Sequence, residues 1–292
     1  MKRLGLMCGG GGIVGIAWEL GVMAGLQETA GFDPGALAVI VGTSAGSVAG
    51  SQIALGKSLP ELVAQQQRPP RPRAAAPAPA RAQPKSGIGT SVLPEEIMAL
   101  MFSGEGTMAE RAVAIARLAA DVPVALSEDE YLASFETMLG TDEWPADVDL
   151  RLTTVEGDTG RTVLWTKDHG IGLVRAVASS CAIPGYFPSV GFDGHRYIDG
   201  PRGNFYRDIV AERGLEAILY IGPLGLLPSG LSLDPEMDEL ARDGFPVLKI
   251  TGGAGLAAVS GELMSPAARV AAAGAGLDDG RTAADAFRAF VA

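Results

Sequence analysis

A serine flanked by glycines constrains the fold of this chain most. Residues 42–46 are Gly-Thr-Ser-Ala-Gly and directly follow the apolar run at residues 37–41. A strand that ends in Gly-x-Ser-x-Gly and passes at once into a helix turns sharply and exposes the serine hydroxyl above the sheet. Gly42 and Gly46 leave room for that turn because glycine has no side chain. The pattern therefore predicts an α/β fold and favours acyl transfer at Ser44.

The elements before and after this motif alternate between strand and helix. An apolar strand at residues 3–8 precedes a turn of four glycines at residues 9–12, and apolar positions recur at helical spacing over residues 14–29. The second strand and the serine turn lead into a helix expected over about residues 46–55. The default packing is a right-handed parallel crossover, which brings the glycine turn and the serine turn to one edge of the sheet.

The glycine turn has two interpretations. Residues 10–15 have the spacing Gly-x-Gly-x-x-Gly between a strand and a helix, which also fits a dinucleotide-binding site. Such a site needs an acidic residue at the end of the second strand. The nearest acid, Asp33, precedes that strand, so this interpretation is disfavoured. Alternatively, Gly10, Gly11 and Gly12 form an oxyanion hole, where bare backbone N–H groups meet the charge that develops on an ester carbonyl.

Two residues are candidates for the base that activates Ser44. His195 can complete a Ser-His-Asp arrangement, although it stands in an expected turn and no histidine follows it. Asp199 follows a short strand-like segment and precedes Gly200, so its carboxylate can accept the hydroxyl proton directly. An Asp-Gly pair is equally typical of a turn with no catalytic role.

The remainder of the chain is expected to extend one domain over residues 1–292. Residues 93–140 have a helical pattern, with an amphipathic stretch from 109 to 120 and a helix cap at Ser127. The tail, 253–292, is rich in Ala and Gly and is expected to be helical with breaks at Pro266 and Gly280. The other expected elements are a hairpin at 148–155 and 161–166, a helix at 172–182, and strands at 217–222 and 246–250.

One segment, residues 68–92, departs from this texture. Its first part is rich in Pro and Ala and contains bases but no acid: Arg68, Arg71, Arg73, Arg81 and Lys85. Such a composition predicts a flexible or extended insertion that does not form a packed core. The segment is either a solvated loop or a basic lid near an anionic membrane or substrate.

Composition excludes several classes of function. The net charge of −11 argues against nucleic acid as the main partner. Two histidines and two cysteines, without a metal-binding spacing, predict no metal and no cofactor. Cys8 and Cys181 lie in apolar runs, so a disulfide framework is not expected and a reducing, cytoplasmic compartment is. No apolar run is long enough for a membrane-spanning helix.

Taken together, four segments resemble the patatin-like phospholipase family. They are the glycine turn at 9–15, the serine motif at 42–46, residues 178–188 (Ala-Ser-Ser-Cys-Ala-Ile-Pro-Gly-Tyr-Phe-Pro) and Asp199-Gly200. The third segment is similar to the family's A-S-x-A-x-P-x-x-F-x-P stretch with one inserted residue. Their order and spacing are more specific than any single motif, and the resemblance extends over about residues 3–222.

This resemblance implies a three-layer αβα sandwich with a mainly parallel sheet, and a serine acyl hydrolase without a metal. Ser44 is the implied nucleophile, Asp199 the implied base, and the substrates are lipids or other acyl esters, with contact to a membrane surface. Two positions depart from the family: Val14, where Arg or Lys is common, and Pro201 after the Asp-Gly pair. They leave open a catalytically weak relative that binds acyl chains or a partner, and an acyltransferase that uses the same residues.

Overall fold

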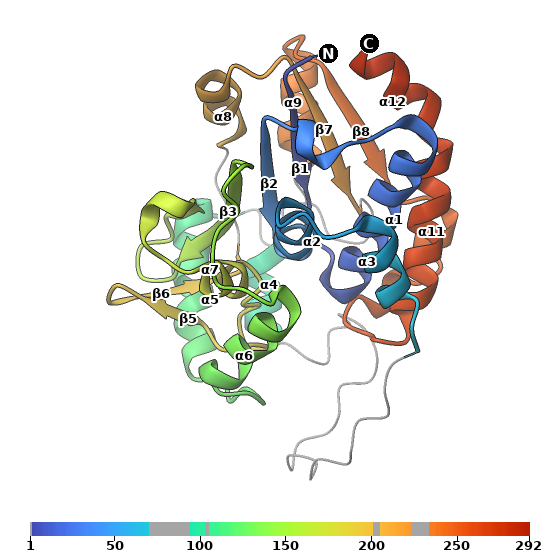
Figure 1. Ribbon diagram of the computed structural model, residues 1–292. Helices are drawn as coiled ribbons and strands as arrows, with labels where there is room; N and C mark the ends of the chain where they lie inside the picture. Colours follow the sequence, from blue (N-terminus) through green and yellow to red (C-terminus); the bar gives the residue numbers. More distant parts are fainter. Residues whose placement is uncertain (1, 70–93, 103–104, 201–204, 224–233) are drawn as a thin grey trace.

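The fold is built on one mixed, mainly parallel sheet (Figure 1). A computed structural model describes residues 2–69, 94–102, 105–200, 205–223 and 234–292. Within these residues the strand order is β5-β6-β3-β2-β1-β7-β8, and β4 pairs with β3. Strands β3, β2, β1, β7 and β8 are parallel to one another, whereas β4, β5 and β6 add antiparallel pairs at one side. The strands are β1 (Leu4–Cys8), β2 (Val39–Thr43), β3 (Leu150–Glu156), β4 (Thr162–Trp165), β5 (Val190–Phe192), β6 (His195–Ile198), β7 (Ala217–Gly222) and β8 (Val247–Thr251).

Helices cover both faces of this sheet, which confirms the αβα sandwich (Figure 1). The longer ones are α1 (Gly12–Ala30), α2 (Ala45–Ala54), α3 (Leu59–Gln66), α4 (Glu95–Phe102), α5 (Met108–Ala120), α6 (Glu128–Leu139), α7 (Leu173–Ser180), α8 (Tyr206–Arg213), α9 (Asp234–Arg242), α11 (Ala268–Thr282) and α12 (Ala284–Val291). Short helical turns are η1 (Pro34–Ala36), η2 (Lys167–His169), α10 (Ala254–Ala257) and η3 (Ser260–Glu262).

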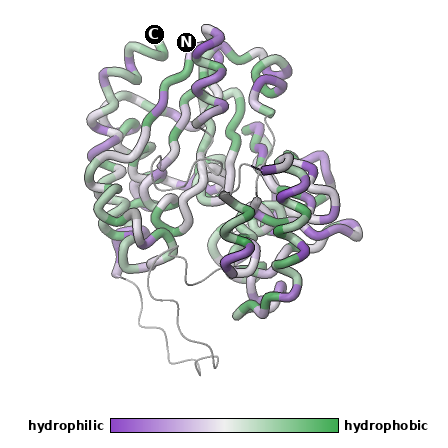
Figure 2. Tube along the Cα trace, turned by 180° about the vertical axis from the view of Figure 1, so that it is seen from behind, coloured by the Kyte–Doolittle hydropathy of each residue, from purple (hydrophilic) through white to green (hydrophobic). Residues whose placement is uncertain are grey.

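Alternation along the strands divides the core into two faces. In β1, Leu6 and Cys8 pack with the layer that contains α1 and α2, whereas Met7 packs with Tyr206 of α8 and Met237 of α9. Successive strand residues point to opposite faces, so a strand buried on both sides is apolar throughout. Figure 2 shows hydrophobic colour along the central strands, whereas the outer helices carry both hydrophobic and hydrophilic colour.

The tail packs against the first helix through glycines. A Cβ at Gly276 would lie 2.1 Å from the carbonyl oxygen of Trp18, and one at Gly280 would lie 2.3 Å from that of Val22. The two backbones approach so closely because neither side chain intervenes. The expected break at Gly280 is therefore wrong: α11 runs through this residue, whose role is close packing against α1.

Several other expectations can be compared with the structure. The hairpin of β3 and β4 is confirmed, and so is the cap at Ser127, whose hydroxyl accepts from the N–H of Glu130 at the start of α6. His195 was expected in a turn and instead begins β6, because the turn falls one residue earlier at Asp193 and Gly194. Most of the basic insertion, residues 70–93, lies outside the described residues.

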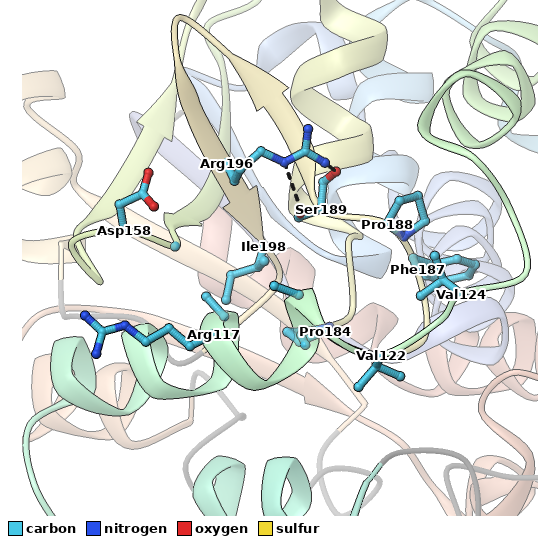
Figure 3. Close-up of a pocket in the computed structure, with 14 residues that line it drawn as sticks. Arg117, Val122, Val124, Asp158, Pro184, Phe187, Pro188, Ser189, Arg196 and Ile198 are labelled. Carbon is cyan, nitrogen blue, oxygen red and sulfur yellow. Dashed lines mark hydrogen bonds between the residues drawn. The ribbon is translucent and has the colours of Figure 1, made fainter.

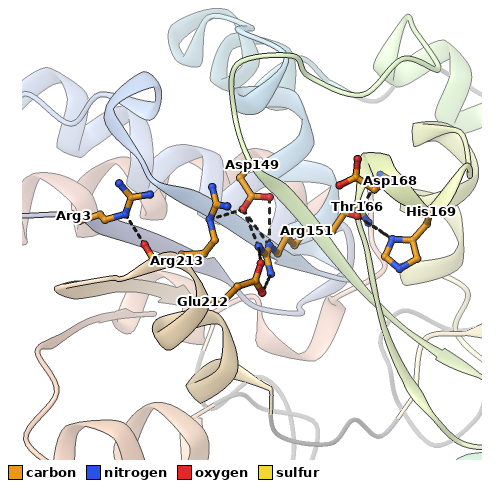
Figure 4. Close-up of polar contacts among 8 residues, drawn as sticks. All are labelled: Arg3, Asp149, Arg151, Thr166, Asp168, His169, Glu212 and Arg213. Atoms are coloured by element: carbon orange, nitrogen blue, oxygen red, sulfur yellow. Dashed lines mark hydrogen bonds and ion pairs between the residues drawn. The ribbon is translucent and has the colours of Figure 1, made fainter.

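A network of ions ties the sheet to α8 at the edge where β3 begins (Figure 4). The guanidinium of Arg151 is buried and contacts Asp149 at 3.1 Å and Glu212 at 2.7 Å. Arg213 also pairs with Asp149, at 2.9 Å, and its carbonyl accepts a hydrogen bond from Arg3. The guanidinium donates hydrogen bonds to Glu212 and to Asp149, and these raise the pKa of Arg151 despite its burial. At this edge, the buried positive charge of Arg151 is therefore balanced by carboxylates of the same chain.

Candidate active site

Ser44 occupies the corner between β2 and α2 in a strained conformation. Its φ is 51° and its ψ is −114°, and the hydroxyl-bearing residue is 7% exposed. Among the described residues, Ser44 and Asp193 are the non-glycine residues with positive φ. Such a conformation costs about 1–3 kcal/mol and persists only where the surrounding structure enforces it. The geometry is that of a nucleophile elbow, in which a tight turn presents the serine at the sheet edge.

Glycines allow the elbow to lie against the turn after β1. The N–H of Gly46 donates to the carbonyl of Gly9 at 2.8 Å, and a Cβ at Gly46 would lie 2.4 Å from the carbonyl oxygen of Cys8. Because β1 and β2 are parallel with Cys8 opposite Gly42, both loops leave the sheet at the same edge. The expected meeting of the glycine turn and the serine motif is confirmed at the level of the backbone.

Several backbone donors at this edge have no internal acceptor. Within the described part of the chain, no hydrogen-bond acceptor meets the N–H groups of Gly10, Gly11, Gly12 or Ala45. Gly12 has a φ of +61°, which favours glycine, and it begins α1. Amides at the start of α1 and α2 therefore combine with the positive ends of both helices, an arrangement suited to a negative charge.

The C-terminal end of α7 holds the elbow from the other side. The hydroxyl of Ser180 accepts from the N–H of Ser44 at 2.9 Å and exchanges a hydrogen bond of 2.5 Å with Ser47. The thiol of Cys181 donates to the carbonyl of Ser44 at 3.2 Å. These contacts fix the backbone of the serine, and motif spacing did not predict them for Ser47 or Ser180.

Asp199 follows β6 directly and lies next to the same segment. Its backbone N–H donates to the carbonyl of Ala182 at 2.9 Å. Burial, with the nearby charge of Asp199, raises the pKa of both Cys181 and Tyr131. The carboxyl group of Asp199 thus lies within electrostatic range of the cysteine that contacts the backbone of Ser44.

Comparison with known proteins identifies the family. The family model described as patatin-like phospholipase matches residues 6–204, more than half of the chain. This chain belongs to the patatin-like phospholipase family. No curated protein matches it. Among solved structures, VipD from Legionella pneumophila has a TM-score of 0.49 at 12% identity, covering 98% of this chain and 67% of VipD. The type III effector protein ExoU has a TM-score of 0.38 at 15% identity, covering 94% of this chain and 53% of ExoU.

The alternative base of this patatin-like chain, His195, lies on the hairpin of β5 and β6. Its ring is about half exposed, and Nδ1 lies 3.4 Å from Asp158 and 3.5 Å from Glu156. Asp199 lies four residues further along the chain, roughly 13 Å at the rise of an extended strand. The neighbours of the imidazole are thus the buried carboxylate of Glu156 in β3 and the exposed carboxylate of Asp158 in the turn after it.

Two residues, Val14 and Pro201, depart from the family pattern, and the structure describes the first of them. Val14 is fully buried in the core, and its N–H donates to the carbonyl of Leu263 at 3.0 Å. The valine therefore contributes packing where a cation is common in the family. Pro201 lies outside the described residues.

An unexpected acid lies beneath the glycine turn of this family member. Glu19 of α1 is fully buried, and in the described structure neither carboxyl oxygen has a hydrogen-bond partner. Burial raises the pKa of Glu19 well above its usual value, although the nearby amide of Gly9, which donates to Ile221, opposes this. Its charge in turn contributes to the raised pKa of Cys8 and Cys181. The sequence signal that could have revealed it is one acid among the otherwise apolar residues 12–26.

Two searches of the described residues were negative. They contain no cluster of three or more His, Cys, Asp or Glu side chains able to hold a metal ion. Nor do the described helices include one that is long and apolar enough to cross a membrane.

Proposed function

We propose that this patatin-like chain hydrolyses lipid acyl esters with Ser44 as nucleophile, Asp199 as general base, and Gly10, Gly11 and Gly12 as oxyanion hole. The observation that carries the proposal is the strained elbow at Ser44 beside backbone amides that meet no acceptor in the described residues. Family membership supports the class of reaction.

The proposed reaction has two halves. Asp199 accepts the hydroxyl proton as the oxygen of Ser44 attacks the ester carbonyl, and the N–H groups of the glycine turn bind the resulting oxyanion. The tetrahedral species collapses, the alcohol leaves with the proton from Asp199, and an acyl-enzyme remains. Water then gives a proton to Asp199 and attacks the acyl group, so that the fatty acid leaves and Ser44 regains its proton. One oxyanion donor contributes about 3–4 kcal/mol to such a transition state.

The test is hydrolysis of a p-nitrophenyl acyl ester by matched variants. Ser44→Ala and Asp199→Asn should each reduce kcat by about 10³-fold or more, because each removes a group that takes part in bond formation. His195→Ala should retain near-normal turnover. Normal turnover in either of the first two variants, or a loss confined to His195→Ala, would contradict the proposed dyad.

Product analysis separates hydrolysis from acyl transfer. With a lipid ester as substrate, the released fatty acid should account for the acyl groups consumed, even when lysolipid or alcohol is added. Acyl groups recovered mainly on the added acceptor would instead assign an acyltransferase.

Two further properties belong to the proposal. We treat residues 1–292 as one domain, supported by the packing of α11 on α1.

Peripheral contact with an anionic membrane surface is attributed to the five bases of residues 68–85. Binding to anionic vesicles should then weaken when these bases are neutralised and when salt is raised, because screening shortens their reach. Binding that is indifferent to both changes would remove this role.

A further inference from the structure

A cavity lies beside β6, the strand that leads to Asp199 (Figure 3). It has a volume of about 400 Å³, within the usual range for small-molecule sites. Its walls come from the end of α5 and the residues after it, from the turn after β3, from residues 184–189 and from the end of β6. The apolar lining residues are Ala116, Ala119, Ala120, Val122, Val124, Pro184, Phe187, Pro188 and Ile198.

Small residues and a braced wall keep this cavity open. Three alanines and Gly157 face it, so that little side-chain volume fills the space. On the opposite wall, Phe187 stacks on Tyr131 with ring centroids 4.8 Å apart. The hydroxyl of Tyr131 is anchored in turn on the carbonyl of Ala178 at 3.2 Å. A wall held in this way resists collapse into the space, as expected of a preformed binding site.

The cavity is polar at one end and apolar at the other. In Figure 3, Arg117 and Asp158 lie at one end, and Val122, Val124 and Phe187 lie at the opposite end. This distribution matches an amphiphile with one aliphatic chain and one polar head.

The charges at the polar end favour an anionic head. Arg196 is already engaged, because its guanidinium donates to Glu128 and to Ser189. Asp158 contacts His195. Arg117 is exposed, and no ion pair or hydrogen bond joins its side chain to the described residues. It is thus the cation at this rim that remains available to a ligand.

We propose that this cavity binds a single-chain anionic amphiphile, with a fatty acid as its occupant, the chain along the alanines of α5 and the carboxylate at Arg117. The choice of fatty acid rests on the proposed function, whose product it is. The wall also continues into the proposed site, since Ile198 precedes Asp199 and Asp199 bonds to Ala182 near Pro184. A fatty acid here would lie behind the Asp199 turn, separate from the ester that Ser44 attacks.

The experiment measures binding of the fluorescent fatty acid cis-parinaric acid to full-length Ser44→Ala protein, below the concentration at which the acid aggregates. Wild type and Ser44→Ala should bind it alike. Ala119→Trp fills the cavity and should weaken binding by at least tenfold, whereas Leu118→Trp introduces the same indole side chain at an exposed neighbour and should bind normally. Arg117→Ala should weaken binding by about tenfold, the effect of one charge-assisted contact.

Competition distinguishes the head groups. Palmitate should displace the probe at lower concentration than hexadecanol, and hexadecyltrimethylammonium should displace it least. If a lysophosphatidate displaces the probe at lower concentration than palmitate, the ligand of the cavity is an anionic lysolipid and the fatty-acid assignment is overturned. Equal displacement by the cationic amphiphile would overturn the role of Arg117.

A photoreactive fatty acid keeps the proposal testable if Ala119→Trp does not fold. Cross-links should map to residues 116–124 or 184–198, and cross-links confined to other peptides would overturn the site. Because binding is measured without turnover, its loss is distinct from failure of the proposed hydrolysis. If the wild-type protein binds the fatty acid in this cavity but has no esterase activity, the cavity assignment stands and the hydrolase proposal is rejected.

Discussion

The two edges of the central sheet treat their buried polar groups in opposite ways. At the edge where β3 begins, the buried guanidinium of Arg151 pairs with Asp149 and Glu212 (Figure 4). At the edge where β1 and β2 end, the buried carboxyl of Glu19 and the glycine amides have no internal partner among the described residues. Both edges are polar and well packed. The difference lies in whether the fold supplies partners for the buried ionisable side chain, which is Arg151 at one edge and Glu19 at the other.

This difference separates a structural role from a functional one. A buried polar group without a partner costs about 1–3 kcal/mol, and the conformation of Ser44 adds a similar amount. The fold carries such costs elsewhere too, since Nε of Arg213 at the opposite edge pairs with Asp149 but has no hydrogen-bond partner in the described residues. At the edge of Ser44 these costs coincide with a positive φ and with close glycine packing of α2. Amide donors without an acceptor in the described residues, next to a strained serine, are what a site for a developing negative charge requires.

The largest expected effect comes from adding one methyl group at the elbow. In Gly46→Ala the new Cβ would lie 2.4 Å from the carbonyl oxygen of Cys8, and backbone cannot move away cheaply. We expect a loss of at least about 3 kcal/mol in unfolding free energy, measured by urea denaturation. Gly274→Ala in α11 is the matched control: nothing lies within 4 Å of its Cβ, so it should gain about 0.5–1 kcal/mol. Equal stability of the two variants would contradict the close contact at the elbow.

The next effect tests the opposite edge. Arg151→Met leaves Asp149 and Glu212 without their shared cation and should cost about 2 kcal/mol. That is less than for a fully enclosed pair, because the side chain of Glu212 is 58% exposed. Turnover per folded molecule should not change. Arg207→Met, which removes an exposed cation near Glu239 and Asp243, is the control and should cost less than about 1 kcal/mol. If Arg151→Met lowers kcat and leaves the unfolding free energy unchanged, the role of Arg151 is not structural and the contrast between the two edges is contradicted.

The third effect depends on pH. The folded protein keeps a proton on Glu19 that the unfolded chain releases above the usual pKa of 4.5. The contribution of this bound proton to stability is therefore complete below that pH and declines as pH rises toward the raised pKa of the folded state. Glu19→Gln stays uncharged and should therefore gain on wild type by about 1.4 kcal/mol per pH unit within this interval. The measurement is urea denaturation at pH 5.5 and pH 8. Exposed Glu61→Gln should show no such trend, and a constant difference between Glu19→Gln and wild type would show that Glu19 ionises normally.

The sequence revealed the local geometry of the elbow better than its surroundings. The order of elements around Gly42, Ser44 and Gly46 follows from spacing alone, because a strand, a glycine-flanked serine and a helix leave few other paths. The contacts of Ser180 and Cys181 with Ser44 join residues more than 130 positions apart, so no local pattern contains them. Gly280 shows the same limit, since a helix breaker in isolation becomes a packing residue once α1 lies against it.

The most direct test of the central claim is covalent labelling of the folded chain with a fluorophosphonate, followed by peptide mass spectrometry. Wild type should acquire one adduct, on the peptide that contains Ser44, and labelling should slow strongly in Asp199→Asn and be absent in Ser44→Ala. An unlabelled wild-type protein, or an adduct on another serine, would contradict a nucleophile at this edge and favour a relative that binds acyl chains without cleaving them.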